Sequence, residues 1–462
     1  MEEQVLTSQR RQTGSTSLSP DAVHFIYEAL ESGDSARALN HLHKLYAPDL
    51  AELLNQSTTE QRQQIINLIR KEFKSEMLVD LEPSVKDEVL EFLGAEKSAA
   101  AIAELDVDDA LYVIEDLDKE EREEILEKIS DKEVRAELEE GLSYPEHSAG
   151  RLMHNVVVSV PSNWNVGQAI DHLRSAEELP DDFHEIYVVD AEHRPVGGIP
   201  VSRALRTHRN IPVKEIMRKD LRLIAPYMDQ EEVAYLFRKY GLVSAPVADE
   251  GLKLVGVITA DDIVDVIQEE TAEDLLRMGG ITGETDLFDN FFKTVKMRFP
   301  WLFVNMLTAS VSASVVSLFT GTIEHLVTLA ILMPIVASLG GNAGTQALTI
   351  IVRALAMKEL NTSNAARVLR KEMIVAFMNG IMIALLGGLA TFVLFREPLV
   401  SMVFTLAIVG NFVMAGTAGA LIPVIMEKLK IDPAIASGIF LSALTDMTGF
   451  FGFLGLATLF LM

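Results

Sequence analysis

The chain has 462 residues and no cysteine, which excludes disulfides and thiolate metal sites. Of its 40 basic and 67 acidic side chains, 11 and 7 lie from Phe291 onward, which leaves 29 and 60 in the first 290 residues. The first part therefore carries a net charge of −31 and the second part +4. A surface this acidic repels nucleic acid and anionic lipid and attracts cations, so we expect no nucleic acid partner.

The N-terminal part is predicted to be α-helical. Residues 1–20 are expected to be disordered, and the opening "MEEQVLTSQRRQTG" has no apolar core. We therefore expect no secretory signal peptide, and an acidic part that stays in the cytoplasm. Residues 21–140 repeat a Leu-rich, acidic pattern, as in "PDLAELLNQSTTEQRQQIINLIR" and "KEEREEILEKIS". Short amphipathic helices in such a series indicate stacked hairpins in a superhelical domain.

An internal repeat follows this helical domain. "AGRLMHNVVVSVPSNWNVGQAIDHLR" matches "VKEIMRKDLRLIAPYMDQEEVAYLFR", and "HEIYVVDAEHRPVGGIPVSRAL" matches "VSAPVADEGLKLVGVITADDIV". Each copy predicts the order strand, helix, strand, strand, helix. This pattern resembles a tandem pair of α/β CBS domains, at residues 141–208 and 209–275. The resemblance implies a regulatory sensor, with an adenine nucleotide as a candidate ligand.

Residues 276–300 are predicted to form an amphipathic connecting helix. Within "DLFDNFFKTVKMRFP", the apolar residues follow a period close to 3.6. They are Phe288, Phe291, Phe292, Val295 and Phe299. This helix is positioned to transmit force from the sensor to the membrane.

Residues 301–462 are predicted to form a transmembrane domain of five helices. The apolar segments lie at about 301–319, 326–352, 373–395, 399–426 and 433–460. Each is long enough for the roughly 20 residues that cross a bilayer. Basic residues precede the first segment and lie between the second and third and between the fourth and fifth. Such loops favour the cytoplasm, so we expect a multi-pass protein of the cell (inner or plasma) membrane, with its C-terminus outside.

The second segment contains "PIVASLGGNAGTQALTII". Gly340, Gly341 and Gly344, with Pro334 upstream, are expected to loosen the helix. Two interpretations stand side by side: tight helix packing through small residues, or a polar pathway lined by irregular backbone. Nearby Asn342, Thr345 and Gln346 favour the pathway. In the fourth segment, close packing is the expected role of Gly410, Gly416 and Gly419.

The fifth segment contains "ALTDMTGFFG", in which Asp446 has no cationic residue near it in sequence. A charge at the bilayer centre costs roughly 2.5–3.5 kcal/mol on insertion scales. Gly438, Ser442 and Asp446 recur every four residues and share one helical face. Asp446 is therefore interpreted as a functional carboxylate, with an interhelical hydrogen bond as the alternative.

The order of parts, with five motifs, resembles the MgtE family of magnesium channels. The motifs are "YPEHSAGRLM" (144–153), "GGNAGTQ" (340–346), "IIVRALA" (350–356), "DPA" (432–434) and "LTDMTG" (444–449). The resemblance implies a homodimer whose pore lies on the two-fold axis between the second and fifth segments, with Mg²⁺ at Asp446. The ion pathway is then expected at Gly341, Asn342, Thr345, Gly438, Ser442, Thr445 and Asp446. Two facing carboxylates would hold a hydrated Mg²⁺ through its waters.

The resemblance also implies regulatory Mg²⁺ in the cytosolic domains. The residues that match sensing positions are Asp108, Asp229, Glu231, Asp262, Asp265, Glu270, Glu273 and Asp432. Clustered carboxylates repel each other without a cation, so Mg²⁺ is expected to favour the closed channel.

The sequence departs from the family pattern at four positions: Tyr112 and Gly241 replace expected acidic residues, and Thr345 and Gly438 replace expected asparagines. Ion selectivity and the strength of the Mg²⁺ gate therefore stay open. The alternatives are a transporter of Co²⁺, Mn²⁺ or Zn²⁺, a carrier coupled to Na⁺ or H⁺ with weak or no gating, and a nucleotide-sensing signalling protein with a membrane anchor. No Ser/His/Asp set, HExxH motif or P-loop stands in the sequence, so an enzyme is not expected.

Overall fold

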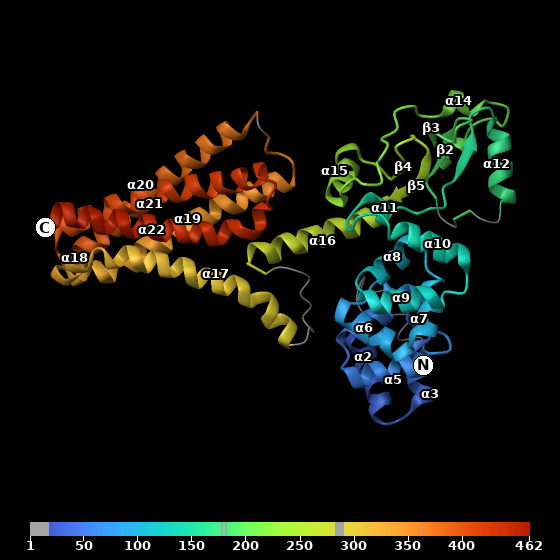
Figure 1. Cartoon of the computed structure of the whole chain (residues 1–462), viewed down its shortest axis with the longest axis horizontal. Helices are drawn as coiled ribbons and strands as arrows, with labels where there is room; N and C mark the ends of the chain where they lie inside the picture. Colours follow the sequence, from blue (N-terminus) through green and yellow to red (C-terminus); the bar gives the residue numbers. More distant parts are fainter. Residues whose placement is uncertain (1–17, 177–178, 181–182, 282–290, 362) are drawn as a thin grey trace. The chain divides into compact units, whose positions relative to one another are not determined.

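The computed structural model describes residues 18–176, 179–180, 183–281, 291–361 and 363–462 (Figure 1). Within these residues the chain divides into two compact units, between Gln268 and Glu269. This division falls before residue 275, where we expected the second CBS copy to end. The predicted disorder of residues 1–17 lies outside the described residues. Leu18 is buried in the helical core and Ser19 caps the first helix, so order begins earlier than we expected.

The first unit begins with the predicted helical domain. Its helices are α2 (Pro20–Glu31), α3 (Ser35–Leu42), α4 (Ala47–Gln56), α5 (Thr59–Ile69), α6 (Pro83–Leu93), α7 (Ala95–Ile102), α8 (Val107–Glu115), α9 (Lys119–Lys128) and α10 (Lys132–Gly141), with a short 3-10 helix, η1 (Ser75–Leu78). Capping side chains start several of them, as where Thr58 and Gln61 form a capping box on α5. A single apolar core runs from Leu18 to Leu138.

The CBS pair completes the first unit. Its elements are α11 (Ala149–Leu152), β1 (Ser159–Pro161), α12 (Val166–Ser175), β2 (Glu185–Val189), β3 (Pro195–Pro200), α13 (Val201–Leu205), α14 (Val213–Ile216), α15 (Gln230–Tyr240), β4 (Ser244–Ala248) and β5 (Leu254–Thr259). The first copy has the predicted order of strands and helices, in which β1 pairs parallel to β2 and β2 pairs antiparallel to β3. In the second copy, β4 and β5 form a hairpin, and the expected first strand is reduced to a bridge between Ile224 and Val247.

Helix α16 (Ala260–Met278) follows β5 and continues across the division between the units. The predicted connecting helix is not a separate element among the described residues. Residues 282–290 lie outside them. The long helix α17 (Phe291–Ser317) begins at Phe291 and continues through Pro300, so residues 291–300 are part of the first membrane helix.

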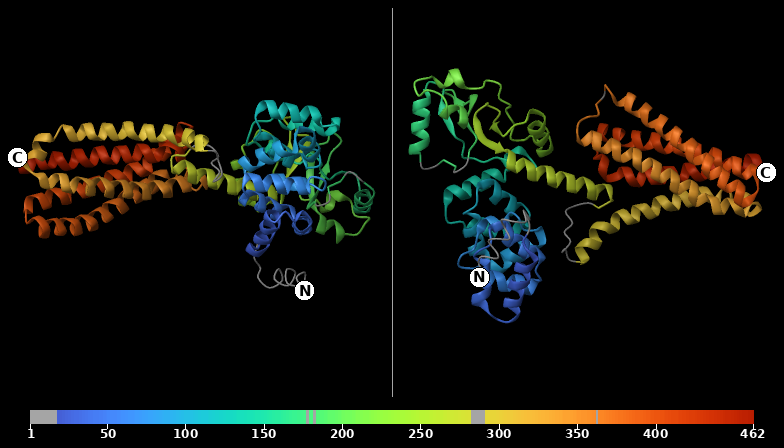
Figure 2. Two further views of the ribbon diagram at one scale, coloured as in Figure 1. Left: turned by 90° about the horizontal axis from the view of Figure 1, so that it is seen from below. Right: turned by 180° about the vertical axis from the view of Figure 1, so that it is seen from behind.

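The second unit holds the membrane domain (Figure 2). Its remaining helices are α18 (Thr320–His325), α19 (Val327–Ala356), α20 (Ala365–Phe395), α21 (Pro398–Lys428) and α22 (Pro433–Leu461). Five helices of the described chain are long and apolar enough to cross a membrane, namely α17, α19, α20, α21 and residues 438–461 of α22. This confirms the five predicted segments.

Helix α19 corrects the expectation of a broken second segment. It is continuous from Val327 to Ala356, and two of its three glycines, Gly340 and Gly344, serve close packing. A Cβ at Gly340 would lie 2.1 Å from Asn411 Nδ2, and one at Gly344 would lie 3.0 Å from Leu441 Cδ1. Among the fourth-segment glycines, Gly416 and Gly419 are closely packed as predicted. Gly410 faces open space, so the packing role expected for it is wrong.

Candidate functional site

Helix α22 carries the carboxylate singled out by the sequence. Asp432 begins the helix by accepting a hydrogen bond of 2.8 Å from the Ala434 backbone N–H. Almost four turns later, Asp446 is partly buried, and its side chain forms no hydrogen bond or ion pair with any described residue. Ser442, one turn before Asp446, is exposed. The interhelical hydrogen bond that was the alternative role for Asp446 is therefore not seen within one chain.

The two sides of α19 have different surroundings. Gly340 and Gly344 pack against α21 and α22, whereas Asn342 and Thr345 are exposed and a Cβ at Gly341 would meet nothing within 4 Å. Thr345 donates its hydroxyl to the Gly341 carbonyl at 2.9 Å. Since the helix is unbroken, the backbone carbonyls near Gly341 are engaged in it and are not freed for an ion. Asn342 and Thr345 remain as polar side chains on this open face.

The other expected pathway residues on α22 differ in exposure. Thr445 is fully buried and donates its hydroxyl to the Ser442 carbonyl at 3.0 Å. Gly438 and Ser442 instead line a cavity of about 490 Å³, together with residues of α17 and of the segment that follows α16. The other lining residues are Met278, Gly279, Gly280, Ile281, Arg298, Trp301, Leu302, Asn305 and Ile439. The structure thus brings Gly438 and Ser442 to one hollow surface.

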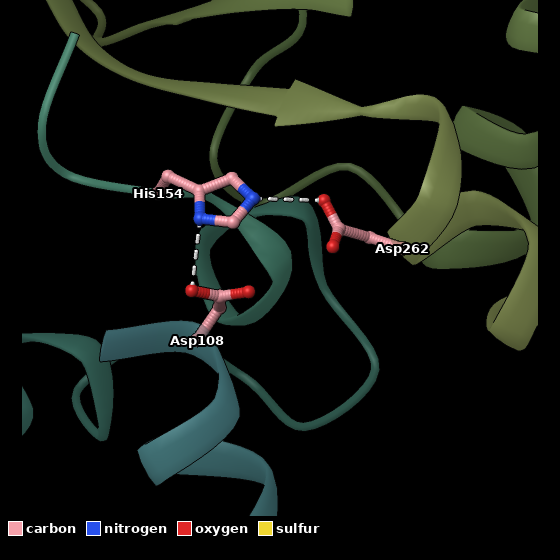
Figure 3. Close-up of side chains that lie close together, drawn as sticks. All are labelled: Asp108, His154 and Asp262. Atoms are coloured by element: carbon pink, nitrogen blue, oxygen red, sulfur yellow. Dashed lines mark hydrogen bonds and ion pairs between the residues drawn. The ribbon is translucent and has the colours of Figure 1, made fainter. Parts of the chain in front are cut away.

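In the first unit, two of the expected sensing residues meet around a histidine (Figure 3). His154 Nδ1 lies 3.0 Å from Asp108 Oδ1, and His154 Nε2 lies 3.1 Å from Asp262 Oδ2. Asp108 belongs to the first turn of α8 and Asp262 to the first turn of α16. The backbone of His154 pairs with Val257 in β5, which fixes the start of the side chain. The ligand atoms of the three residues all lie within 4.8 Å of one another.

The electrostatics of this cluster are dominated by carboxylates. Burial lowers the pKa of His154, but the neighbouring carboxylates of Asp108 and Asp262 outweigh it and raise that pKa to about 11. Burial, with the charges of Asp108 and Asp106, raises the pKa of the adjacent Asp109 to about 7. The site therefore stabilises a positive charge between α8 and α16.

A second carboxylate cluster lies in the second unit, at the end of α16. Arg277 pairs with Glu273 of its own helix, and its Nη1 lies 2.6 Å from Asp432 Oδ2. Burial raises the pKa of Asp274 to about 6, with further contributions from the charges of Asp432 and Glu270. Arg277 is thus the cationic partner of two expected Mg²⁺ ligands, Glu273 and Asp432.

Two further expected sensing residues, Asp229 and Asp265, lie outside these two clusters. Asp229 caps α15 and accepts a hydrogen bond of 2.9 Å from the Glu231 backbone N–H, which is a structural use of its carboxylate. Asp265 is exposed on α16, and burial together with the charges of Asp262 and Asp80 raises its pKa. The carboxylates of Asp80 and Asp262 are therefore close enough to Asp265 to affect its charge.

Two departures from the family pattern have local explanations. Tyr112 lies with its ring centroid 4.5 Å from Lys86 Nζ, and this fully buried Lys86 also pairs with Asp116 at 2.7 Å. Gly241 ends α15 in the left-handed region, with a φ of 61°, where glycine is strongly favoured. An acidic side chain at Gly241 would strain this helix end.

No pattern in the sequence predicted a role for His154. Asp108 and Asp262 are far apart in the chain, so no spacing motif links them to a histidine. Only the pairing of His154 with β5 brings the ring between the two carboxylates.

Three family models match parts of this chain, and two magnesium transporters are similar to nearly all of it. Residues 333–456 match the family model MgtE, described as a divalent cation transporter, residues 45–147 match the MgtE intracellular N domain, and residues 213–269 match the CBS domain. The magnesium transporter MgtE of Thermus thermophilus is 31% identical over 442 residues, which cover 94% of this chain and 98% of that protein. The magnesium transporter MgtE of Bacillus subtilis is 28% identical over 421 residues, covering 91% and 93% of the two chains.

A solved structure is also similar. It is the cytosolic domain of the Mg²⁺ channel MgtE in complex with ATP, with 30% identity and a TM-score of 0.49, and the similarity covers 53% of this chain and 99% of that one.

A helical acidic domain, a CBS domain and five helices able to cross a membrane define a multi-pass cation transport protein with attached helical and CBS domains. The chain belongs to the MgtE family of divalent cation transporters. It is accordingly a transport protein and not an enzyme.

Proposed function

We propose that this protein moves Mg²⁺ across the cell membrane along a pathway between α19 and α22, with Asp446 as the ion-binding carboxylate. The observation that carries the proposal is the place of Asp446, partly buried in a membrane helix and without a partner among the described residues. An intramembrane carboxylate of this kind is retained where an ion or a proton is its partner. The magnesium transporters similar to this chain support Mg²⁺ as the ion.

The pathway is proposed to lie on the two-fold axis of a homodimer. One chain supplies one Asp446, and a second chain would place another carboxylate opposite it. Two such charges attract a dication that keeps its water shell, since Mg²⁺ dehydrates reluctantly. The exposed Asn342, Thr345 and Ser442 are suitable partners for those waters, as the adjoining Gly341 and Gly438 leave room beside them. Thr445 is proposed to support the helix through its bond to Ser442.

The acidic domains are proposed to be cytoplasmic and to close the channel when cytosolic Mg²⁺ is high. Basic loops around the membrane segments favour this orientation, which leaves the C-terminus outside. The proposed gate uses the carboxylates of both units: Asp108, Asp229, Glu231, Asp262, Asp265, Glu270, Glu273 and Asp432. Support comes from the pKa values of Asp109 and Asp274, which burial and, after it, the charges of neighbouring carboxylates raise; a divalent cation would relieve the second effect.

These carboxylates do not suit Mg²⁺ equally well. Oxygen donors predominate at the end of α16, which fits a hard cation. At Asp108 and Asp262 an imidazole nitrogen stands between the oxygens, and this donor set fits Mg²⁺ poorly. We therefore place the main Mg²⁺ response in the α16 carboxylates and in Asp432. An adenine nucleotide at the CBS pair is a further part of the proposal, supported by the CBS match alone.

Ion flux into liposomes that contain the purified protein tests the proposal. Mg²⁺ is compared with Co²⁺, Mn²⁺ and Zn²⁺, with and without Na⁺ and H⁺ gradients. The channel account expects Mg²⁺ to move down its own gradient at a rate that collapse of the Na⁺ and H⁺ gradients leaves unchanged. Flux that stops when either gradient is collapsed would support a coupled carrier. Faster flux of Co²⁺, Mn²⁺ or Zn²⁺ than of Mg²⁺ would make that ion the transported substrate.

A further inference from the structure

The imidazole of His154 has the surroundings of a metal-binding histidine. Its Nδ1 faces Asp108, whose side chain is nine-tenths buried, and its Nε2 faces Asp262 Oδ2 at 3.1 Å (Figure 3). Asp108 Oδ1 is inaccessible to solvent and has no well-formed hydrogen bond with a described residue. The polar atom beside it is His154 Nδ1, at 3.0 Å. Metal-bound histidines commonly have this order, in which a carboxylate holds one ring nitrogen and the metal binds the other.

The distance between Nε2 and Asp262 Oδ2 suits a metal that bridges them. Two ligand atoms about 2.1 Å from a tetrahedral Zn²⁺ lie roughly 3.4 Å apart. The observed separation of 3.1 Å requires only a small outward movement of one side chain. The ion would take the place of the proton that now lies between the two atoms.

Further oxygen donors lie beside this pair. Thr259 Oγ1 lies 3.5 Å from His154 Nε2 and donates to Asp262 Oδ2 at 2.7 Å. The same hydroxyl lies 2.5 Å from Asp261 Oδ1, which brings a second carboxylate to the edge of the site. Asp261 is exposed, so it is free of packing constraints and water can complete the coordination.

We propose that His154 Nε2 and Asp262, assisted by Asp261, bind a transition-metal dication of the Zn²⁺ type, and that Asp108 orients the ring through Nδ1. The nitrogen donor decides the class of ion, because imidazole suits Zn²⁺ and its neighbours in the first transition row, whereas Mg²⁺ and Ca²⁺ take oxygen. This site does not involve Asp446. It shares Asp108 and Asp262 with the proposed Mg²⁺ gate, where the imidazole makes their donor set a poor fit for Mg²⁺.

An ion at this site would connect three segments of the first unit. Asp108 lies on α8 of the helical domain, His154 follows α11, and Asp262 begins α16. Metal binding would therefore fasten the helical domain to the second CBS copy with a ligand other than Mg²⁺. The chain would respond to two classes of cation through two sets of donors.

Equilibrium dialysis of the full-length protein against Zn²⁺ tests the site, with millimolar Mg²⁺ present to occupy oxygen-only carboxylate sites. We expect one Mg²⁺-resistant Zn²⁺ per chain, lost in His154→Gln and Asp262→Asn. Asp108→Asn should retain the site with about 10–100-fold weaker binding, as is typical when the partner of a ligating histidine is removed. His43→Gln is the matched control, because His43 pairs with Glu72 at the surface of the helical domain.

Two further measurements keep the result independent of folding and of transport. Zinc X-ray absorption on the unaltered protein should show a nitrogen ligand at about 2.0–2.1 Å. Asp446→Ala should keep the Zn²⁺ even if it abolishes flux. Unchanged Zn²⁺ binding in His154→Gln, displacement of all Zn²⁺ by Mg²⁺, or an oxygen-only absorption spectrum would overturn the proposal.

Discussion

Arg277 Nη1 lies 2.6 Å from Asp432 Oδ2, which joins the last turn of α16 to the residue that caps α22. Both side chains are roughly three-quarters buried, so water screens this ion pair less than a pair at the surface. Because α22 also carries Ser442 and Asp446, the pair links the end of α16 directly to the helix of the proposed ion pathway.

Removing the positive charge of Arg277 should loosen this link. Arg277→Gln leaves the neighbouring carboxylates of Glu273, Asp274 and Asp432 without their cation, so their repulsion should increase hydrogen exchange over residues 269–278. Millimolar Mg²⁺ should reduce the difference from wild type, since it supplies the missing charge. Hydrogen–deuterium exchange measures both effects. Arg222→Gln, at an exposed residue that pairs with Asp220, is the control, and equal exchange in all three proteins would contradict the link.

Asp274 gives the α16 cluster a predictable pH dependence. Burial and the charge of Asp432 raise its pKa from 3.8 to about 6, so the folded protein binds this proton more tightly than the unfolded chain. The stability that this carboxyl contributes is present below its usual pKa and is lost as pH rises through about 6. Asp274→Asn should therefore stabilise the protein at pH 7.5, by roughly 1 kcal/mol after allowance for solvent screening.

Thermal unfolding in detergent checks this prediction. The unfolding temperature of Asp274→Asn should exceed that of wild type at pH 7.5, and the two should converge near pH 4. Glu250→Gln, in the exposed turn between β4 and β5, should leave the unfolding temperature unchanged. A stabilisation that persists unchanged at the acidic pH would assign the effect to packing instead of charge.

Mg²⁺ should protect the acidic domains from proteolysis. The first 290 residues carry −31, and carboxylates are concentrated at 229–232, 261–265 and 269–274. Millimolar Mg²⁺ should slow limited proteolysis of these domains more than a monovalent salt at matched ionic strength, because a dication bridges carboxylates that a monovalent ion only screens. Equal cleavage rates would show that the cytosolic part does not sense divalent cations.

Deletion of residues 1–140 should leave transport intact and relieve inhibition by internal Mg²⁺. The core of the helical domain runs from Leu18 to Leu138, so the deletion removes it nearly as a unit. The pathway residues all lie in the second unit and are untouched. Flux measured against internal Mg²⁺ for both proteins gives the answer. A truncated dimer without flux would make the domain structural, and identical curves would place sensing in the CBS pair, at Asp432, or outside this chain.

The sequence predicted the larger features because they depend on local patterns. Five apolar segments and the repeated strand–helix order need no knowledge of distant contacts. The five segments are confirmed, and so is the order of strands in the first CBS copy, whereas the first strand of the second copy is reduced to a bridge. Glycine was harder to interpret. Gly340 and Gly344 suggested a broken helix, but α19 is continuous, because the chain uses their small size against Asn411 and Leu441.

The cytosolic clusters depended on contacts that no sequence pattern records. His154 meets Asp108 and Asp262 only after β5 and α8 are in place, and Arg277 meets Asp432 across 155 residues of chain. The carboxylates were predictable as a group from charge, while the cations that accompany them were not. Which residues line the ion pathway stays a prediction.

The measurement that tests the account most directly is Mg²⁺ flux through Asp446 variants in liposomes with a Mg²⁺ indicator. Asp446→Ala should abolish flux while the protein stays folded, because in the proposed dimer it removes both facing carboxylates at once. Asp446→Asn should lose flux or selectivity, since it keeps the shape without the charge. Glu397→Ala, in the loop before α21, should transport normally. Wild-type flux in either Asp446 variant would remove this carboxylate from the ion pathway.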